Sequence, residues 1–196
     1  MVTGLFNFLN QYARVDEEDF KVLMNKLEIR NYNKKDRLVQ IGEVENNMHY
    51  IGKGLIRKFF YRDDEEVITQ VIKEGHIISS TASFLSRKPS QYILEALEPT
   101  TTFSITYDKL ESLYGLGNKW ESIGRVITAH FLIQQEVLLM DNIRLTVKER
   151  FKKFMIENPD LIQRVPQKHL ASYLNIKQET FSRMKHLMYD KSLKTV

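Results

Sequence analysis

The spacing of hydrophobic residues divides the chain into segments of different character. Over residues 5–29 apolar residues recur at helical spacing, as at Phe20, Leu23 and Leu27. Residues 32–106 instead hold short runs rich in β-branched and aromatic residues, separated by Gly, Asn, Asp and Pro. The sequence therefore predicts helix first, then an antiparallel β-barrel or sandwich. Within the β region, the "GKG" of residues 52–54 predicts a hairpin turn, because glycine adopts positive φ without steric cost.

A long helical pattern follows over residues 119–143, with no Pro or Gly after Gly124. One apolar stripe follows a 3-4 repeat and is interrupted by a histidine; it comprises Ile123, Val126, His130, Ile133, Val137 and Met140. Further apolar residues lie beside it at Ile127, Phe131 and Leu138. A helix that is apolar on more than one side needs more than one partner surface. We predict that one stripe packs on the barrel and the other forms a seam with a second subunit. Burial of the whole helix inside a monomer is the alternative.

Two short helical patterns joined by a tight turn lie near the C-terminus, in "HLASYLNIKQETFSRMKHL". Counted from Gln167, the positions that two crossing helices must share are apolar at Leu170, Leu174, Ile176, Phe181 and Met184. Ala171 falls where the helices approach most closely. Asn175 takes the turn position, and asparagine tolerates the left-handed backbone region. The spacing predicts a helix-turn-helix.

The second helix of this pair carries the side chains that a DNA reader needs at its N-terminus. Arg183, Gln178 and Glu179 match the hydrogen-bonding edges of guanine, adenine and cytosine respectively. Side chains suited to phosphate contacts surround them at Lys168, Lys177, Thr180, Ser182 and Lys185. Residues 144–196 hold 12 Lys and Arg against 5 Asp and Glu, whereas residues 1–143 hold 17 against 20. A slightly acidic body with a basic C-terminal quarter favours a polyanionic partner for that quarter alone. An ordinary solvated helix would leave this asymmetry unexplained.

Composition excludes several other classes. With 42% hydrophobic and 28% charged residues, the 196-residue chain has the composition of a soluble globular protein. It has no membrane-length apolar run and no signal-peptide pattern at its N-terminus, so we expect a cytoplasmic protein that does not bind membranes. The absence of cysteine excludes disulfides, thiolate metal sites and cysteine nucleophiles. The five histidines show no metal-ligand spacing, and no catalytic motif is present, so we expect neither a metal site nor an enzyme.

These segments resemble the catabolite activator (cyclic-AMP receptor) and fumarate–nitrate regulator family of bacterial transcription factors. "MHYIGKGLIRKFF" is similar to the barrel hairpin of that family, "GHIISSTASFLSRKPSQYILEAL" to its phosphate-binding cassette, and "IKQETFSRMKHL" to its recognition helix. The resemblance implies an α+β chain with a cyclic-nucleotide-binding-like sensor β-barrel (residues 1–117), a dimerisation helix (118–144) and a helix-turn-helix domain (145–196). It also implies base contacts from Glu179 and Arg183, and RNA polymerase as a further partner.

The chain departs from the family pattern at the cassette. Cyclic-AMP binders carry a Glu for the ribose and an Arg for the phosphate, followed by a small hydroxyl residue; here these positions hold Ser80, Ser90 and Gln91. Loss of the Arg removes a charge-assisted hydrogen bond of about 1.5–3 kcal/mol. We therefore expect no cyclic-AMP binding and no other cofactor, while a different small effector stays open. Its pocket would be lined by Ser79, Ser80, Thr81, Ser83, Ser90 and Gln91.

A second departure is at the C-terminus, where "YDKSLKTV" is too short for a full wing hairpin. We therefore predict a helix-turn-helix with a reduced or absent wing. The favoured hypothesis is a homodimeric regulator that binds double-stranded DNA at an inverted repeat and does not respond to cyclic AMP. The alternative is a ligand-binding signalling module that acts through protein–protein contacts, with the C-terminal helices as its docking surface.

Overall fold

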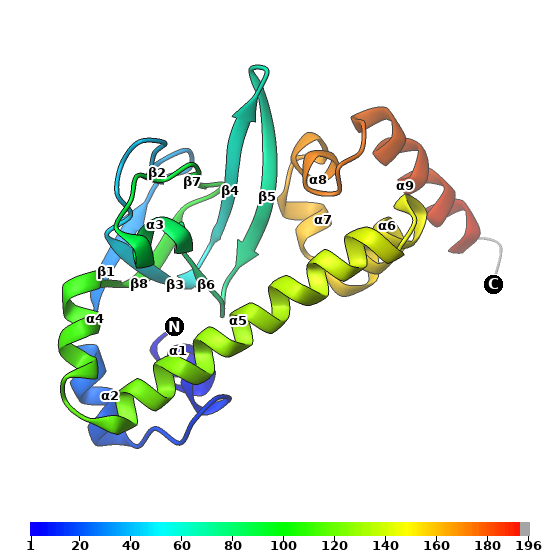
Figure 1. The fold of residues 1–196 in the computed structure, drawn as a ribbon. Helices are drawn as coiled ribbons and strands as arrows, with labels where there is room; N and C mark the ends of the chain where they lie inside the picture. The colour runs from blue at the N-terminus through cyan, green and yellow to red at the C-terminus, as the bar shows by residue number, and fades with distance from the viewer. Residues whose placement is uncertain (193–196) are drawn as a thin grey trace. The chain divides into compact units, whose positions relative to one another are not determined.

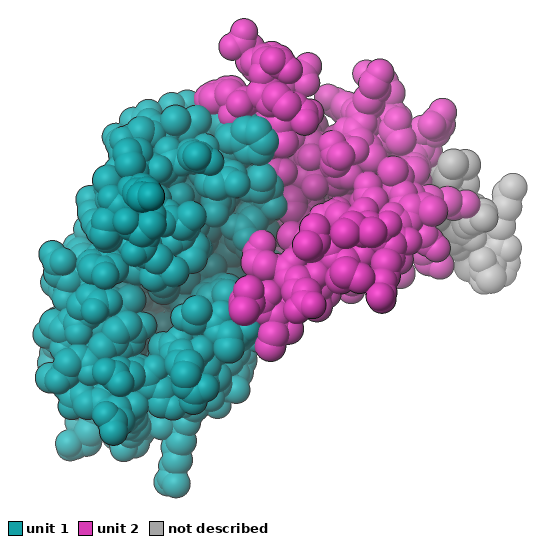
Figure 2. All heavy atoms as spheres, viewed as in Figure 1, with its two compact units in different colours: residues 1–60, 69–131 teal, residues 61–68, 132–196 magenta. Residues whose placement is uncertain are grey.

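The computed structural model describes the backbone of residues 1–192 and the side chains of residues 1–186. The chain forms two compact units, one of residues 1–60 and 69–131 and one of residues 61–68 and 132–196 (Figures 1 and 2). The long helix α5 (Asn118–Arg144) contributes its first half to unit 1 and its second half to unit 2. Each unit has its own core and is described separately.

Unit 1 is built around two four-stranded sheets. The first has the strand order β1-β8-β3-β6 and the second the order β2-β7-β4-β5. The strands that pair in these sheets with a determined register are antiparallel. Their bounds are β1 (Glu28–Tyr32), β2 (Arg37–Val39), β3 (Asn47–Lys53), β4 (Leu55–Arg62), β5 (Glu65–Lys73), β6 (Ile77–Ile78), β7 (Ile93–Ala96) and β8 (Thr100–Thr106). The antiparallel β fold predicted from the alternating pattern is confirmed.

The turn at residues 52–54 is not a hairpin, and that prediction is wrong. β3 pairs with β8 and β6 in the first sheet, whereas β4 lies between β7 and β5 in the second. The turn therefore carries the chain from one sheet to the other. Gly54 has a φ of 99°, so the glycine is needed for the turn, but the turn does not join paired strands. The next turn is the hairpin: Asp63 and Asp64 between β4 and β5 both have positive φ, as a type I′ turn requires.

Four helices accompany the sheets of unit 1: α1 (Val2–Asn10), α2 (Glu17–Met24), α3 (Thr81–Ser86) and α4 (Tyr107–Tyr114). The acids before α2 form a capping box, in which Asp16 and Asp19 each accept a hydrogen bond from the other's backbone N–H. The helical prediction for residues 5–29 extends too far, because β1 begins at Glu28. Its five residues show an alternating burial pattern, and Ile29 is paired with Phe103 of β8.

The sheet β1-β8-β3-β6 has two faces of opposite chemistry. Along β8, Thr102 and Ser104 point to one face, and Phe103 and Ile105 to the other, because side chains alternate in a strand. The apolar face packs with the N-terminal helices, α4 and the start of α5 in one hydrophobic cluster. A second cluster fills the space between the sheets; it contains Val39, Ile51, Ile56, Ile78 and Leu94. The polar face of the first sheet looks into that space.

Unit 2 contains the second half of α5, the tip of the β4–β5 hairpin and four further helices: α6 (Val147–Glu157), α7 (Leu161–Arg164), α8 (Gln167–Tyr173) and α9 (Gln178–Ser192). A capping box between Thr146 and Glu149 starts α6. The core of the unit includes an edge-to-face pair of Phe151 and Phe181, with ring centroids 5.2 Å apart. The prediction of a missing wing concerns residues 189–196; α9 continues through Ser192, and residues 193–196 lie outside the described part of the chain.

The two halves of α5 differ in how much apolar surface they expose. Trp120 and Ile123 of the predicted long helix are buried in unit 1, and the ring of His130 lies 4.9 Å from that of Tyr12. Val126 and Met140 are half-buried. Apolar side chains in the second half are exposed at Leu132, Ile133, Val137, Leu139 and Ile143. The protomer thus covers the start of the predicted stripe itself and leaves its later part uncovered.

Candidate DNA-binding surface and effector pocket

The helix pair α8–α9 is held together by the residues that the sequence pattern assigns to its shared core. Leu170 and Phe181 are fully buried, and Ala171 is 2% exposed where the helices meet. Asn175 has a φ of 54°, the left-handed conformation that the turn requires. The backbone N–H of Ile176 donates to the carbonyl of Ala171 at 3.0 Å and closes the turn. This packing fixes which face of α9 remains toward solvent.

That free face carries the predicted DNA contacts. Gln178, Glu179 and Arg183 are exposed, and they lie in the first two turns of α9. Lys168 and Lys177 are also exposed, whereas Thr180, Ser182 and Lys185 are half-buried. The arrangement provides three long side chains able to read base edges, with hydroxyl and ammonium groups beside them.

A contact that the sequence did not predict links α8 to the β4–β5 hairpin tip within unit 2. The Ser172 hydroxyl donates to the carbonyl of Glu66 at 2.9 Å and accepts from the N–H of Ile68 at 3.0 Å. A side chain thus satisfies both backbone groups at the edge of β5. The two segments are 104 residues apart, so no local sequence signal could have shown this contact.

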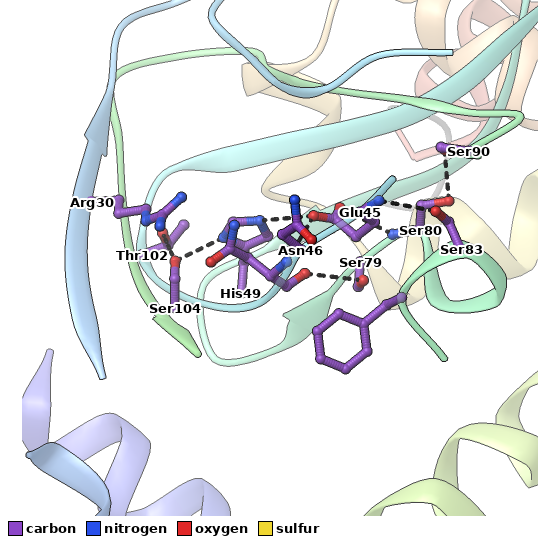
Figure 3. A network of polar contacts seen from close by, with 12 residues as sticks. Arg30, Glu45, Asn46, His49, Ser79, Ser80, Ser83, Ser90, Thr102 and Ser104 are labelled. Carbon is purple, nitrogen blue, oxygen red and sulfur yellow. Dashed lines mark hydrogen bonds and ion pairs between the residues drawn. The ribbon is translucent and has the colours of Figure 1, made fainter. Parts of the chain in front are cut away.

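The cassette serines gather in the interior of unit 1, where their hydroxyls bond to each other or to nearby backbone groups (Figure 3). Ser90 Oγ donates to Ser80 Oγ at 2.8 Å and lies 2.8 Å from the carbonyl of Tyr92. Ser83 Oγ accepts from the N–H of Glu45 and donates to the carbonyl of Lys88. Ser79 Oγ donates to the carbonyl of Asn47 at 3.2 Å. All four serines are buried, and their hydroxyls hold the cassette together.

The other two predicted pocket residues do not join this group. Thr81 and Gln91 are exposed. Thr81 is the first residue of α3 and lines a different cavity, on the outer side of the sheet. Arg87 stands next to the cassette, but its guanidinium donates to the carbonyls of Glu45 and Phe84, so it serves the loop structure.

Glu45 is the buried acid at the centre of the polar network. It is 1% exposed, and its carboxylate accepts hydrogen bonds from the N–H groups of Asn47 and Ser80. Burial raises its pKa above the usual carboxyl value. His49, completely buried on β3, lies with its Nε2 4.0 Å from Glu45 Oε1. Its Nδ1 is 2.8 Å from Ser104 Oγ, which also lies 2.8 Å from the Thr102 hydroxyl. Burial lowers the pKa of His49 to about 3, so the ring is neutral at pH 7.

Lys58 is the cation beside the cassette, and sequence analysis missed it. It lies on β4, its ammonium donates to the carbonyl of Ser79 at 3.3 Å, and it stands 4.4 Å from the centre of the Tyr92 ring. Burial lowers its pKa to about 8, although the Glu45 carboxylate acts in the opposite direction. The sequence signal was an arginine and a lysine inside a strand of apolar residues, "LIRKFF". The single positive charge of Lys58 is thus offset by the nearby acid.

These groups do not fit a cyclic nucleotide in the manner that the family cassette provides. A cyclic phosphate needs hydrogen-bond donors and a guanidinium, but the serine hydroxyls are already engaged and Ser90 stands at the arginine position. If ionised, Glu45 would place a negative charge near the phosphate. If protonated, it would accept weaker hydrogen bonds from the backbone N–H groups of Asn47 and Ser80. Most polar groups of the interior bond to one another, but Asn47 Oδ1 and His49 Nε2 are buried without a hydrogen-bond partner among the described residues.

Two general features concern the described residues as a whole. No helix within residues 1–192 is long and apolar enough to span a bilayer. In the same part of the chain, no three histidine or acidic side chains lie close enough together to hold a metal ion.

Comparison with known proteins agrees with this architecture. Residues 29–115 match the family model of the cyclic nucleotide-binding domain. The chain as a whole is similar in structure to FixK2 from Bradyrhizobium japonicum, with a TM-score of 0.72, 18% identity, and coverage of 85% of this chain and 86% of FixK2. A search of curated protein sequences gave no match.

Two further solved structures show the same fold. One is the c-di-GMP-responsive global regulator CLP of Xanthomonas campestris, with a TM-score of 0.65, 17% identity, and coverage of 90% of this chain and 93% of CLP. The other is the catabolite activator protein of Thermus thermophilus, with a TM-score of 0.59, 14% identity, and coverage of 94% and 88%. The chain therefore has the fold of the catabolite activator and fumarate–nitrate regulators, and the resemblance is confirmed at that level.

Proposed function

We propose that the protein is a transcription regulator that binds DNA as a homodimer and reads sequence with the N-terminal half of α9. The observation that carries the proposal is the solvent face of α9, where Gln178, Glu179 and Arg183 are exposed while Leu170 and Phe181 fix the helix from behind. The basic charge of residues 144–196 supports it. Binding occurs at an inverted repeat with half-sites about 34 Å apart.

The exposed apolar residues of α5 supply the seam of the dimer. Leu132, Ile133, Val137, Leu139 and Ile143 are between 47% and 71% exposed in the protomer, an unusual density of apolar surface on one helix. Ile133→Glu places a charge in this surface and is expected to give a monomer in sedimentation experiments. Glu136→Gln, an exposed change on the same helix, should remain dimeric. A dimeric Ile133→Glu variant would show that the dimer contact lies on another surface.

The first experiment is selection of bound sequences from a random DNA pool by the purified protein without an added effector. An enriched inverted repeat supports a dimeric reader. Recovery of DNA without any sequence preference would instead favour the protein-docking alternative for the C-terminal helices.

Arg183→Ala tests the reader directly. The variant should lose about 1–3 kcal/mol of binding free energy at one base position of each half-site and tolerate other bases there. Lys168→Ala, a predicted phosphate contact, should weaken binding to all sequences alike and reduce its salt dependence. An Arg183→Ala variant with unchanged sequence preference would remove this residue as a reader.

Cyclic AMP is not the effector in this proposal, because the cassette offers a serine pair where a phosphate needs an arginine. Calorimetric titration with cyclic AMP up to millimolar concentration should show no binding. A Ser90→Arg variant serves as the matched comparison, since it restores the missing charge at the expected position. Tight binding by the unmodified protein would contradict the proposal.

A further inference from the structure

A cavity of about 170 Å³ lies on the outer side of the sheet β1-β8-β3-β6, within unit 1. The sheet contributes Tyr50 and Phe103 to its wall, α1 and α2 contribute leucines, and α4 and α5 close it on the remaining sides. It is separated from the buried cassette serines by the thickness of the sheet, since Thr102 and Ser104 face the opposite way from Phe103. From the cassette segment itself, Ile77, Thr81 and Leu85 line the cavity. The cavity is a second site, distinct from the barrel interior.

The walls are almost entirely apolar. Leucine, isoleucine, methionine and aromatic side chains make up most of the lining, and none of the described residues around the cavity is a lysine, arginine or histidine. The one ionisable acid is Glu111, an exposed residue of α4. A carboxylate or phosphate ligand would lose its hydration without gaining a cation and would meet a like charge. These walls exclude anions and favour a neutral, mainly apolar molecule.

The polar groups of the lining include the hydroxyls of Tyr50 and Tyr114; the others belong to Thr81, Tyr107, Glu111 and Thr128. Neither Tyr50 nor Tyr114 forms a hydrogen bond to another described residue through its hydroxyl. Each hydroxyl lies against a helical glycine: a Cβ on Gly4 would stand 3.1 Å from the oxygen of Tyr50, and one on Gly124 would collide with the end of the Tyr114 side chain. Burial raises the pKa of both phenols, so each stays protonated and able to donate.

We propose that this cavity binds a small, uncharged, largely apolar molecule that accepts a hydrogen bond from the Tyr114 hydroxyl, such as an aromatic or short aliphatic ketone, aldehyde or ester. The size agrees, because cavities of about 150 Å³ with aliphatic and aromatic walls accommodate benzene. The polarity agrees as well, since pockets for small ligands combine apolar walls with a few hydrogen-bonding groups that fix orientation. Residues 120–131 of α5 form part of the wall, so an occupant contacts the helix to which the proposed function assigns dimerisation.

Binding is measurable without DNA, through the only tryptophan of the chain. Trp120 is 6% exposed and lines the cavity. Bromobenzene, whose heavy atom quenches indole fluorescence on contact, should quench Trp120 along a saturable curve. Quenching that rises linearly with concentration, without saturation, would overturn the proposal. Because this assay does not involve DNA, its failure is distinct from failure of the proposed function.

A cavity-filling variant and a matched control locate the bound probe. Leu110→Phe adds volume to the wall and should weaken bromobenzene binding at least tenfold. Leu116→Phe makes the same change at an exposed position outside the lining and should leave it unchanged. Far-ultraviolet circular dichroism and thermal unfolding check that both variants fold. Equal affinity in the two variants would place the probe elsewhere and overturn the assignment.

The hydrogen bond is tested with two isosteric competitors, acetophenone and its hydrocarbon analogue α-methylstyrene. Each displaces bromobenzene, and the unmodified protein should prefer acetophenone by about fivefold. Tyr114→Phe should abolish that preference while leaving the affinity for bromobenzene within twofold. This variant also locates the bound probe if Leu110→Phe does not fold. Retention of the preference in Tyr114→Phe would overturn the role of this hydroxyl, and benzoate should not compete in either protein.

Discussion

The two faces of the sheet β1-β8-β3-β6 differ in almost every property that decides what a surface can bind. Its inner face presents Thr102, Ser104 and His49, buried and linked to one another by hydrogen bonds. Its outer face presents Tyr50 and Phe103 to an apolar cavity, in which the hydroxyls of Tyr50 and Tyr114 have no hydrogen-bond partner among the described residues. The inner face lies beside the cassette serines, which the sequence resemblance assigns to an effector pocket, yet most of its polar groups bond to one another. The comparison teaches that the position of a pocket in a fold does not by itself say where a ligand is best accommodated.

The largest effect is expected from loss of packing on the outer face. Phe103 is 1% exposed, and Phe103→Ala should lower the free energy of unfolding by about 3–5 kcal/mol, because it removes a buried ring and enlarges the cavity. Its register partner on β1, Ile29, is 61% exposed, so Ile29→Ala should change stability by about 0.5 kcal/mol or less. Urea unfolding measures both. Similar losses in the two variants would mean that Phe103 is no more tightly packed than its exposed register partner.

The next effect concerns the buried charge of Lys58, and its size depends on pH. The pKa of Lys58 is about 8 in the folded protein and 10.5 in the unfolded chain, so the unfolded chain binds more protons between these values. Stability of the unmodified protein should therefore rise from pH 8 to pH 10.5. Below pH 8 the buried charge costs up to about 3 kcal/mol, which Lys58→Met should recover at pH 7. This gain should disappear above pH 10.5.

Lys53→Met, at the exposed end of β3, is the control for the loss of one lysine. Its stability relative to the unmodified protein should show no comparable change across this pH range. A Lys58→Met variant that is less stable than the unmodified protein at pH 7 would show that Glu45 and Tyr92 compensate the buried ammonium fully.

A smaller effect is expected from the inner hydroxyls. Ser104→Ala deprives both His49 Nδ1 and the Thr102 hydroxyl of a buried partner, and should lower the free energy of unfolding by about 1–3 kcal/mol. Thr128→Ala, at an exposed position of α5 beside the outer cavity, removes a hydroxyl with no such role. Equal stability of the two variants, measured in urea, would contradict the description of the inner face as a coupled network.

The smallest effect is expected at the outer phenol. Tyr114→Phe removes a hydroxyl that has no partner among the described residues, so stability should change by about 0.5 kcal/mol or less. Thermal unfolding of the two proteins side by side measures this. A loss above about 1 kcal/mol would reveal a hydrogen bond of this hydroxyl in solution.

The sequence was informative where structure depends on neighbours in the chain. The α8–α9 pair was predicted from apolar spacing, Ala171 and Asn175, because the geometry of two helices and a short turn is set within about 20 residues. The two acidic capping boxes follow from local hydrogen bonding in the same way. The turn at residues 52–54 was misread because conformation is local but pairing is not. Gly54 shows that the chain turns there, and only the positions of β7 and β8 decide that it changes sheets.

The site residues that the sequence missed depend on distant contacts. Lys58 is a charged residue within β4, and the sequence does not show that its ammonium reaches the carbonyl of Ser79 in the cassette. Ser172 reads as one more polar position on a short helix until the β4–β5 hairpin reaches it. Likewise, the lining of the outer cavity comes from residues 5 to 131 and has no motif. Apolar stripes on helices predict that these helices pack against the sheet, but they do not predict that the packing leaves a cavity.

Gly124 of α5 lies at the cavity wall, and adding one methyl group there would change the cavity. Any side chain at Gly124 meets the end of Tyr114, so an alanine there displaces the phenol. Alanine also suits the helix interior better than glycine by about 1 kcal/mol, so the exchange need not weaken α5 itself. Glycine and alanine codons differ by one nucleotide. One point mutation could therefore remove or restore the proposed binding of an apolar molecule, while leaving the sequence of α9 unchanged.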